Sequence, residues 1–284
     1  MTDDTRHGND RLLSRGAASI FEQWWLPAGD PRAVVAIVHG YAEHSGRYQH
    51  LAAFLNSRGY AVEAFDLRGH GQSSGRRVYV SSFSEYLSDV ARFLRAVHER
   101  HPGKPIFLLG HSMGGGIATL FVIARRPQIA GLILSGPALR FRSAPTGLRM
   151  RGLRLLGKVA PTYSLAPLPA AAISRDPAVV EAYENDPLVY RGGMRLGHGA
   201  ASMRALQRVQ LDMEEIEVPL LVMHGSADRL TSPEGSEELV ERARSTDKTL
   251  KIYDGLYHEI FNEPEQESVM QDLAEWLDAH TNNE

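Results

Sequence analysis

The sequence contains no cysteine, which excludes disulfide bonds and every metal or redox site that needs a thiolate. It also lacks an excess of charge of one sign, because 31 Lys and Arg face 34 Asp and Glu and the formal net charge is −3. Nucleic acid, whose phosphates bind concentrated positive charge, is therefore not expected as a partner. No run reaches the roughly 18 apolar residues of a membrane span, and residues 1–15 lack the apolar stretch of a secretory leader. We expect a cytoplasmic protein with no signal peptide or transmembrane segment, and nothing in the sequence indicates its oligomeric state.

Short apolar runs alternate with helical patterns along most of the chain. Several runs are nearly continuous Val, Ile, Leu and Ala, as in strands covered on both faces. This alternation predicts an α/β fold with a mostly parallel, doubly wound sheet. An antiparallel hairpin is predicted within 18–25, where Ile20 and Trp24 alternate with polar neighbours. The expected core strands are 33–39, 61–65, 106–110, 132–135, 220–223 and 250–253.

Two parts of the chain depart from this pattern. Residues 1–16 are rich in Asp, Arg, Asn and Gly and predict a flexible N-terminal tail. From 140 to 208 the strand pattern stops, and ten Arg and one Lys face four acidic residues, a local net charge of +7. We interpret 140–208 as a helical cap, or lid, inserted into an α/β core formed by 17–139 and 209–284.

The most informative local motif is GHSMG at Gly110–Gly114. It follows the apolar run 106–109 and precedes the helical pattern 117–124. A G-x-S-x-G motif between a strand and a helix is typical of the nucleophile elbow, where the serine lies on a strained turn. The start of the following helix favours developing negative charge. We therefore predict that Ser112 is a nucleophile, with an incidental serine in a Gly-rich turn as the alternative.

A serine hydroxyl is a weak nucleophile and needs a base that is itself held by a third group. In chains with this elbow the partners follow in the order Ser, acid, His. Asp228 lies just beyond the expected strand 220–223, and His258 follows the last strand. The rival acid, Asp254, is too close in sequence to His258 to face it easily. We predict Asp228 and His258 as the acid and the base, although an aspartate in an Asx-turn is the alternative for Asp228.

An oxyanion hole needs two backbone N–H groups aimed at the oxygen on which charge develops. One comes from the residue after the nucleophile, Met113. The other comes from the loop after the third strand, and Tyr41 is the predicted donor there. No H-E-x-x-H motif is completed, so no metal site is expected.

Taken together, several motifs resemble those of monoacylglycerol lipases, most closely the bacterial type, over nearly the whole chain after residue 17. GHSMG alone is widespread among hydrolases, whereas its combination with EHSGRY and NDPL is much more specific. The segments that carry the resemblance are His39–Tyr48 (HGYAEHSGRY), Phe65–Ser73 (FDLRGHGQS), Gly110–Gly115 (GHSMGG), Ser135–Ala138 (SGPA), Asn185–Leu188 (NDPL) and Gly255–Glu263 (GLYHEIFNE).

The resemblance implies an α/β-hydrolase fold and hydrolysis of monoacylglycerol to glycerol and a fatty acid, without a cofactor. It implies the same triad of Ser112, Asp228 and His258, and backbone N–H donors at Tyr41 and Met113. Members of the family more often carry a small residue where Tyr41 stands, and a large side chain there can shape the acyl pocket.

Three further residues are candidates for substrate binding: Glu43, Arg47 and Tyr183. For Glu43 and Arg47 we prefer the alternative of a buried ion pair that braces the oxyanion loop.

The cap is the expected contact with lipid. Residues 148–159 combine Leu and Val with Arg and Lys in the pattern of a basic amphipathic helix, which can rest on an anionic lipid surface. The alternative is a helix whose apolar side packs on the enzyme core. The expected partners are thus a monoacylglycerol or similar single-chain lipid ester and, through the cap, a membrane or lipid aggregate.

Two other functions remain open from the sequence. A lysophospholipase or a broad carboxylesterase would use the same triad. A non-catalytic lipid-binding protein is the more distant alternative, since such proteins usually lose a member of the triad.

Overall fold

The computed structural model describes residues 6–14, 18–142, 152, 157 and 159–281. The strands are β1 (Arg6–Ser14), β2 (Ala18–Leu26), β3 (Ala33–Val38), β4 (Tyr60–Phe65), β5 (Ile106–His111), β6 (Gly131–Ser135), β7 (Leu220–Gly225) and β8 (Lys248–Tyr253). The α-helices are α1 (Gln49–Asn56), α2 (Ser84–Arg100), α3 (Met113–Arg125), α5 (Pro177–Asn185), α6 (Leu196–Leu211), α7 (Pro233–Arg242) and α8 (Gln266–Thr281). Short 3-10 turns are η1 (Ser45–Tyr48), η2 (Ala170–Ala172), η3 (Met213–Glu215) and η4 (Ile260–Asn262).

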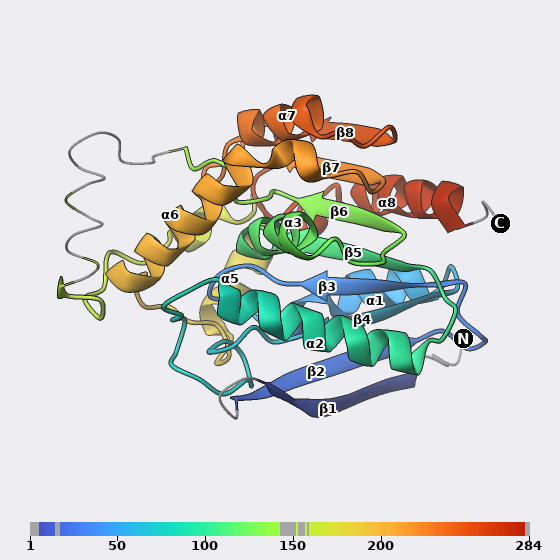
Figure 1. Cartoon of the computed structure of the whole chain (residues 1–284), viewed down its shortest axis with the longest axis horizontal. Coiled ribbons are helices and arrows are strands. Elements are labelled where there is room, and N and C mark those ends of the chain that lie inside the picture. The colour runs from blue at the N-terminus through green and yellow to red at the C-terminus, as the bar shows by residue number, and fades with distance from the viewer. Residues whose placement is uncertain (1–5, 15–17, 143–151, 153–156, 158, 282–284) are drawn as a thin grey trace.

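The strands form one eight-stranded sheet in the order β1-β2-β4-β3-β5-β6-β7-β8. From β4 to β8 every neighbouring pair is parallel, whereas β1–β2 and β2–β4 are antiparallel. Helices cover both faces of the sheet (Figure 1). The predicted mostly parallel, doubly wound α/β sheet is confirmed.

Two apolar layers sandwich the sheet because alternate residues of each strand point to opposite faces. In β3, Val34 and Val38 join the layer formed with α2 and α3. Val35 and Ile37 join the layer formed with α1 and α8. Every residue of β3 is fully buried, which is why the run is almost entirely Val, Ile and Ala.

The beginning of the chain differs from expectation in two ways. The flexible tail predicted for 1–16 is wrong over Arg6–Ser14, which forms β1 at the edge of the sheet. Ala18–Leu26 is a single strand and not a hairpin, and it lies between two antiparallel partners, β1 and β4. β1 has only two apolar residues, Leu12 and Leu13, and hence no alternating pattern. The strand is held by its pairing with β2 and by the stacking of His7 on Trp25, and not by a buried apolar face.

The described residues between β6 and β7 hold α5 and α6 and contribute no strand to the sheet. α6 lies beyond the carboxyl ends of the parallel strands (Figure 1). That this segment is a separate cap with boundaries at 140 and 208 stays a prediction. Most of the amphipathic helix predicted at 148–159 lies outside the described residues. In the part of the chain that the structure describes, no helix combines the length and apolar character needed to cross a membrane.

Candidate active site

Ser112 lies on a sharp turn between β5 and α3. Its backbone has φ 52° and ψ −119°, a conformation that is strained for a residue with a side chain. Glycines at both sides of the turn let the backbone pass, because a Cβ at Gly110 would lie 2.6 Å from the Gly114 carbonyl oxygen and one at Gly114 would overlap that of Val38. The motif thus has the geometry expected of a nucleophile elbow.

Asp228 and His258 meet across the loops that follow β7 and β8. The His258 Nδ1–H donates to Asp228 Oδ2 over 2.7 Å, and both side chains are buried. Asp228 also accepts from Thr231 Oγ1 at 2.7 Å and from the backbone N–H groups of Leu230 and Thr231 at 2.7 and 3.0 Å. The rival Asp254 instead accepts from Ser226 Oγ at 3.1 Å. The loop after β7 therefore fixes one carboxylate against the imidazole.

Burial and charge act in opposite directions on this pair. Burial raises the pKa of Asp228, but the charge of His258 and hydrogen bonds from His224 and His258 outweigh it and lower the pKa below its ordinary value. Burial lowers the pKa of His258, but the carboxylate of Asp228 and its hydrogen bond outweigh it and raise the pKa above its ordinary value. The pair thus favours an ionised acid beside an imidazole that accepts a proton readily.

Ser112 and His258 line the same cavity. Because Nδ1 of His258 faces Asp228, its Nε2 is left for the serine. No hydrogen bond joins these two described side chains in the structure, and such contacts often tighten only when substrate binds.

The predicted oxyanion loop lies beside the elbow. Gly40 N–H donates to Glu43 Oε1 at 2.6 Å, which turns this part of the backbone inward. Among the described residues, the N–H groups of Tyr41 and Met113 have no protein acceptor, so both are free to bind an oxyanion. His39 braces the loop from behind, because its Nδ1–H donates to Gly40 O and its Nε2 accepts from the Leu67 N–H.

Glu43 and Arg47 belong to a buried ionic network. Arg47 Nη1 donates to Glu43 Oε2 at 3.0 Å, and its two terminal nitrogens bind the carboxylate of Glu259 at 2.6 and 2.7 Å. Tyr48 OH also donates to Glu43. Burial raises the pKa of Glu259, but Arg47 outweighs it and lowers the pKa to about 2. The Glu43–Arg47 ion pair expected from the sequence is present, and it connects to the loop through Gly40.

Tyr183, the third candidate for substrate binding, comes from α5. The Arg47 guanidinium lies over the Tyr183 ring, with its carbon Cζ 4.9 Å from the ring centroid. Tyr183 and Glu43 line the same cavity as Ser112, whereas Arg47 does not reach it. Substrate binding by these three residues stays a prediction.

The segment after α5 holds the oxyanion loop from outside. His44 Nε2–H donates to Asp186 Oδ2 at 2.8 Å, and Tyr190 N–H donates to Ala42 O at 2.8 Å. Ala42 has φ 70°, in the left-handed region that a residue with a side chain rarely adopts. The two motifs EHSGRY and NDPL therefore meet in space, and the contact fixes the carbonyl next to the predicted donor Tyr41.

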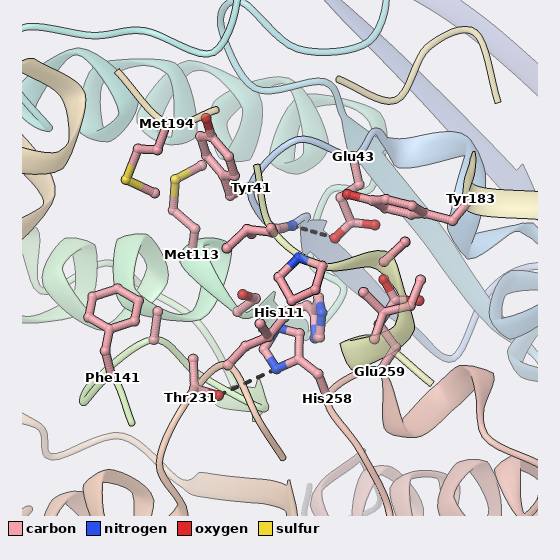
Figure 2. Close-up of a pocket in the computed structure, with 18 of the residues that line it drawn as sticks. Tyr41, Glu43, His111, Met113, Phe141, Tyr183, Met194, Thr231, His258 and Glu259 are labelled. Carbon is pink, nitrogen blue, oxygen red and sulfur yellow. Dashed lines mark hydrogen bonds between the residues drawn. The ribbon is translucent and has the colours of Figure 1, made fainter. Parts of the chain in front are cut away.

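The cavity at Ser112 has an apolar and a polar side (Figure 2). Met113, Phe141 and Met194 lie on one side, and Glu43 and Glu259 on the other. Leu168, Ile173 and Leu230 add to the apolar lining. This division of the lining suits a molecule with a hydrocarbon part and a polar part.

Sequence reasoning missed several partners of these groups. Glu259, which binds Arg47, follows His258 directly, but no motif in the sequence marks it as a partner of Arg47. His224 Nε2 lies 3.1 Å from Asp228 Oδ2, and nothing in the sequence singles out this histidine. Thr231 gave no signal beyond its place in the loop after the acid, where a hydroxyl can reach back to a carboxylate three residues earlier.

The chain is similar to known proteins over most of its length. A family model described as serine aminopeptidase, S33, matches residues 29–265. The monoacylglycerol lipase of Mycolicibacterium smegmatis is 41% identical over 265 residues, which cover 93% of this chain and 95% of that protein. Human monoglyceride lipase is 38% identical over 273 residues, covering 95% and 90%. The crystal structure of Paleococcus ferrophilus monoacylglycerol lipase aligns with a TM-score of 0.80 at 32% identity, covering 97% of this chain and 99% of that one.

Proposed function

The chain belongs to the monoacylglycerol lipase family of α/β-hydrolases, and from this premise we propose that it is an acylglycerol lipase with Ser112 as its nucleophile. It hydrolyses the ester bond of a monoacylglycerol to glycerol and a free fatty acid through an acyl-enzyme. The observation that carries the proposal is the buried His258–Asp228 pair, which faces the same cavity as the strained turn at Ser112.

Acylation begins when Ser112 Oγ attacks the ester carbonyl carbon and its proton passes to His258 Nε2. Asp228 stays ionised, holds the imidazole by Nδ1–H and stabilises the imidazolium. The carbonyl oxygen becomes an oxyanion and accepts hydrogen bonds from the N–H groups of Tyr41 and Met113. When the intermediate collapses, the C–O bond to glycerol breaks and the glycerol oxygen takes the proton from His258.

Deacylation repeats these steps with water. His258, neutral again, takes a proton from a water molecule as its oxygen attacks the acyl carbon. The second oxyanion uses the same two donors. The bond to Ser112 Oγ then breaks, the serine recovers its proton from His258, and the fatty acid leaves.

The first test uses a fluorophosphonate probe together with an assay on a monoacylglycerol. The wild-type protein should be labelled and active, whereas Ser112→Ala should lose the label and about 10⁶-fold in kcat. Ser226→Ala, which changes a half-buried serine outside the elbow, is the control and should keep both. Labelling that persists in Ser112→Ala, or activity that survives it, would refute the assignment.

The division of the cavity supports a single-chain substrate. We place the acyl chain along Met113, Phe141 and Met194, where each buried methylene contributes roughly 0.8 kcal/mol. The headgroup then faces Glu43 and Glu259. Two buried carboxylates suit hydroxyl groups and repel a phosphate, so a monoacylglycerol should be hydrolysed faster than lysophosphatidylcholine of equal chain length. A faster reaction with lysophosphatidylcholine would favour a lysophospholipase, and a preference for short nitrophenyl esters a general carboxylesterase.

Contact with lipid aggregates is a finer part of the proposal. Val159, Tyr163, Leu165 and Leu168 are exposed by 76%, 66%, 43% and 42%, and together we name them the cap patch. Leu168 also lines the cavity at Ser112. We propose that the 140–208 cap rests this patch on a lipid surface in the cytoplasm and passes one acyl chain inward.

Vesicle binding tests the cap patch. The double variant Val159→Ser/Tyr163→Ser should bind phosphatidylcholine vesicles containing monoacylglycerol several-fold more weakly, because two exposed apolar side chains are lost. Its activity on a short soluble ester should be unchanged. Leu13→Ser, a similarly exposed change (73%) on β1, is the matched control. Equal vesicle binding by all three proteins would exclude the patch as the lipid contact.

A further inference from the structure

Four aromatic side chains from separate segments form a closed ring behind the oxyanion loop. They are Tyr41 of that loop, His70 of the loop after β4, Tyr86 of α2 and His198 of α6. Around the ring, the distances between neighbouring centroids are 6.0, 6.5, 6.2 and 5.6 Å. His70, Tyr86 and His198 are at most 1% exposed, and Tyr41 is 9% exposed. The four side chains therefore pack against one another where the core meets α6.

The polar atoms of this ring have no protein partner. The structure's described residues include eight buried side-chain N or O atoms without a hydrogen bond, and half of them belong to these four rings. They are the hydroxyls of Tyr41 and Tyr86 and the Nε2 atoms of His70 and His198. Buried polar groups are seldom left unpaired, because each unmade hydrogen bond is costly. Such a concentration indicates a bound molecule that supplies the missing bonds.

The other ring nitrogens define what that molecule must offer. His70 Nδ1 donates to the Arg68 carbonyl at 3.1 Å, so its Nε2 is an acceptor. His198 Nδ1 accepts from the Val80 N–H at 3.4 Å, so its Nε2 carries the proton and is a donor. Burial lowers the pKa of both imidazoles, that of His198 to about 4, and both are therefore neutral at pH 7. The tyrosine hydroxyl can act in either sense.

We propose that a buried water molecule binds inside this ring, to His70 Nε2, Tyr86 OH and His198 Nε2. The water donates to His70, accepts from His198 and exchanges its third bond with Tyr86, which matches the roughly three hydrogen bonds of a typical buried water. An ion would meet neither a carboxylate nor a charged imidazole there. An apolar ligand would leave all three groups unsatisfied.

The site has a place in the mechanism because of the residues it joins. His198 belongs to α6, within the proposed cap, whereas His70 and Tyr86 belong to the core. Tyr41 closes the fourth side, and its ring lies next to Met194, two residues before α6 (Figure 2). The water thus ties α6 to the core directly behind the loop that supplies the predicted oxyanion donor, and it is a positioning element and not a reactant.

A crystal structure of the whole enzyme that resolves ordered solvent tests the site directly. One water should lie within about 2.7–3.2 Å of the three polar atoms. A well-ordered ring with no peak inside it, or direct hydrogen bonds between its members, would overturn the proposal.

A variant supplies a second test, in which the sign of the change in Tm distinguishes a hydrated ring from a dry one. Tyr86→Phe removes one partner of the water and should lower Tm by about 2–4 °C, because a hydrogen bond is lost. If the ring were dry, the same change would remove an unpaired hydroxyl, and Tm would stay equal or rise. Tyr60→Phe calibrates the loss of a partnered hydroxyl, because Tyr60 OH donates to Asp278 at 2.7 Å.

Hydrogen exchange separates the proposed tie from general destabilisation. The two variants are compared at temperatures that lie the same number of degrees below their respective Tm values. Under these conditions the amides of α6 should exchange several-fold faster in Tyr86→Phe than in Tyr60→Phe. Equal exchange in α6 would show that the site does not join this helix to the core. Neither measurement depends on catalysis, so the outcome is independent of whether Ser112 is the nucleophile.

Discussion

The acid–base half and the oxyanion half of the site are held in place by partners of different origin. On the acid–base side, Asp228 takes one hydrogen bond from the base His258, and its other side-chain bonds come from within four residues of it in the sequence, from Thr231, Leu230 and His224. On the oxyanion side, the loop at Tyr41 is held by groups from distant segments. Those groups are Glu259 through Arg47, Asp186 through His44, and the backbone of Tyr190.

The difference teaches that the acid side chain is fixed mostly by its own loop, whereas the oxyanion loop is fixed by the tertiary structure. The backbone of the acid loop is also tied to the segment after β6, because Arg142 donates to the carbonyls of Ser226 and Asp228. The oxyanion loop depends on the segment after α5 being docked. A change in that segment can therefore alter catalysis without touching a reacting atom.

The largest effect should come from the acid. Asp228→Asn should lower kcat by about 10⁴-fold with the fold intact, because the amide favours the wrong tautomer of His258. Asp254→Asn should stay near wild type, since Asp254 contacts Ser226 instead. Steady-state kinetics on a monoacylglycerol measure both. The reverse order of effects would exchange the roles of the two acids.

A smaller effect is expected from the acceptor that orients the oxyanion loop. Glu43→Ala removes the partner of the Gly40 N–H and should lower kcat by about tenfold, less than the 10²–10³ lost with a true oxyanion donor. Because Arg47 keeps Glu259, the fold should survive. An unchanged kcat with a raised KM would instead indicate that Glu43 acts only on the substrate headgroup, which faces it in the proposed binding mode, and does not orient the loop.

The pH profile compares the halves through His258. Burial lowers the pKa of His258, but the effect of Asp228 is larger and raises that pKa above its ordinary value. The acid limb of kcat/KM should therefore lie above the ordinary histidine value of 6.5. In Asp228→Asn the limb should move to lower pH, because the two largest causes that raise the pKa of His258 are lost while burial still lowers it. In Glu43→Ala it should move much less, since Glu43 contributes least among the causes named for that shift. A limb that stays in place in Asp228→Asn would contradict the pairing.

The smallest effect should come from the segment after α5. Asp186→Ala breaks the contact with His44 and should lower kcat by a few-fold with little change in KM. Asp176→Ala is the matched control. It removes only the side-chain hydrogen bond at the N-terminus of α5, where Asp176 accepts from the Ala178 N–H at 2.8 Å. A double-mutant cycle with His44→Ala should show that the two changes are not additive. Additive effects would mean that the pair does not position the loop.

Much of the fold could be predicted from the sequence because its core strands are buried on both faces. Continuous apolar runs such as 33–38 and 106–109 are then unavoidable, and the strands lie where the runs do. β1 could not be predicted, because its side chains are polar and its position depends on hydrogen bonds to β2. Backbone pairing of this kind leaves no mark on composition.

For the site, the sequence predicts the residues that must follow strands and misses those that act on them from elsewhere. Ser112, Asp228 and His258 each lie in the turn or loop that follows a parallel strand, so their places follow from topology. The bond between Asp186 and His44 spans 142 positions. No periodicity links such residues, and only the resemblance of their two motifs to one family hinted that they belong together.

The edge strand β1 has a practical consequence for handling the protein. On one side, β2 pairs with β4 over Glu22–Trp25, and the backbone of Ser19 and Phe21 bonds to residues of the 66–74 loop. The other side of β2 depends on β1 for its hydrogen bonds. A shortened protein that starts at residue 18 would expose a row of unpaired backbone amides and carbonyls along this edge of β2, next to Ile20 and Phe21. Such a row recruits strands from other molecules. Affinity tags and truncations are therefore better placed after α8 than before β2.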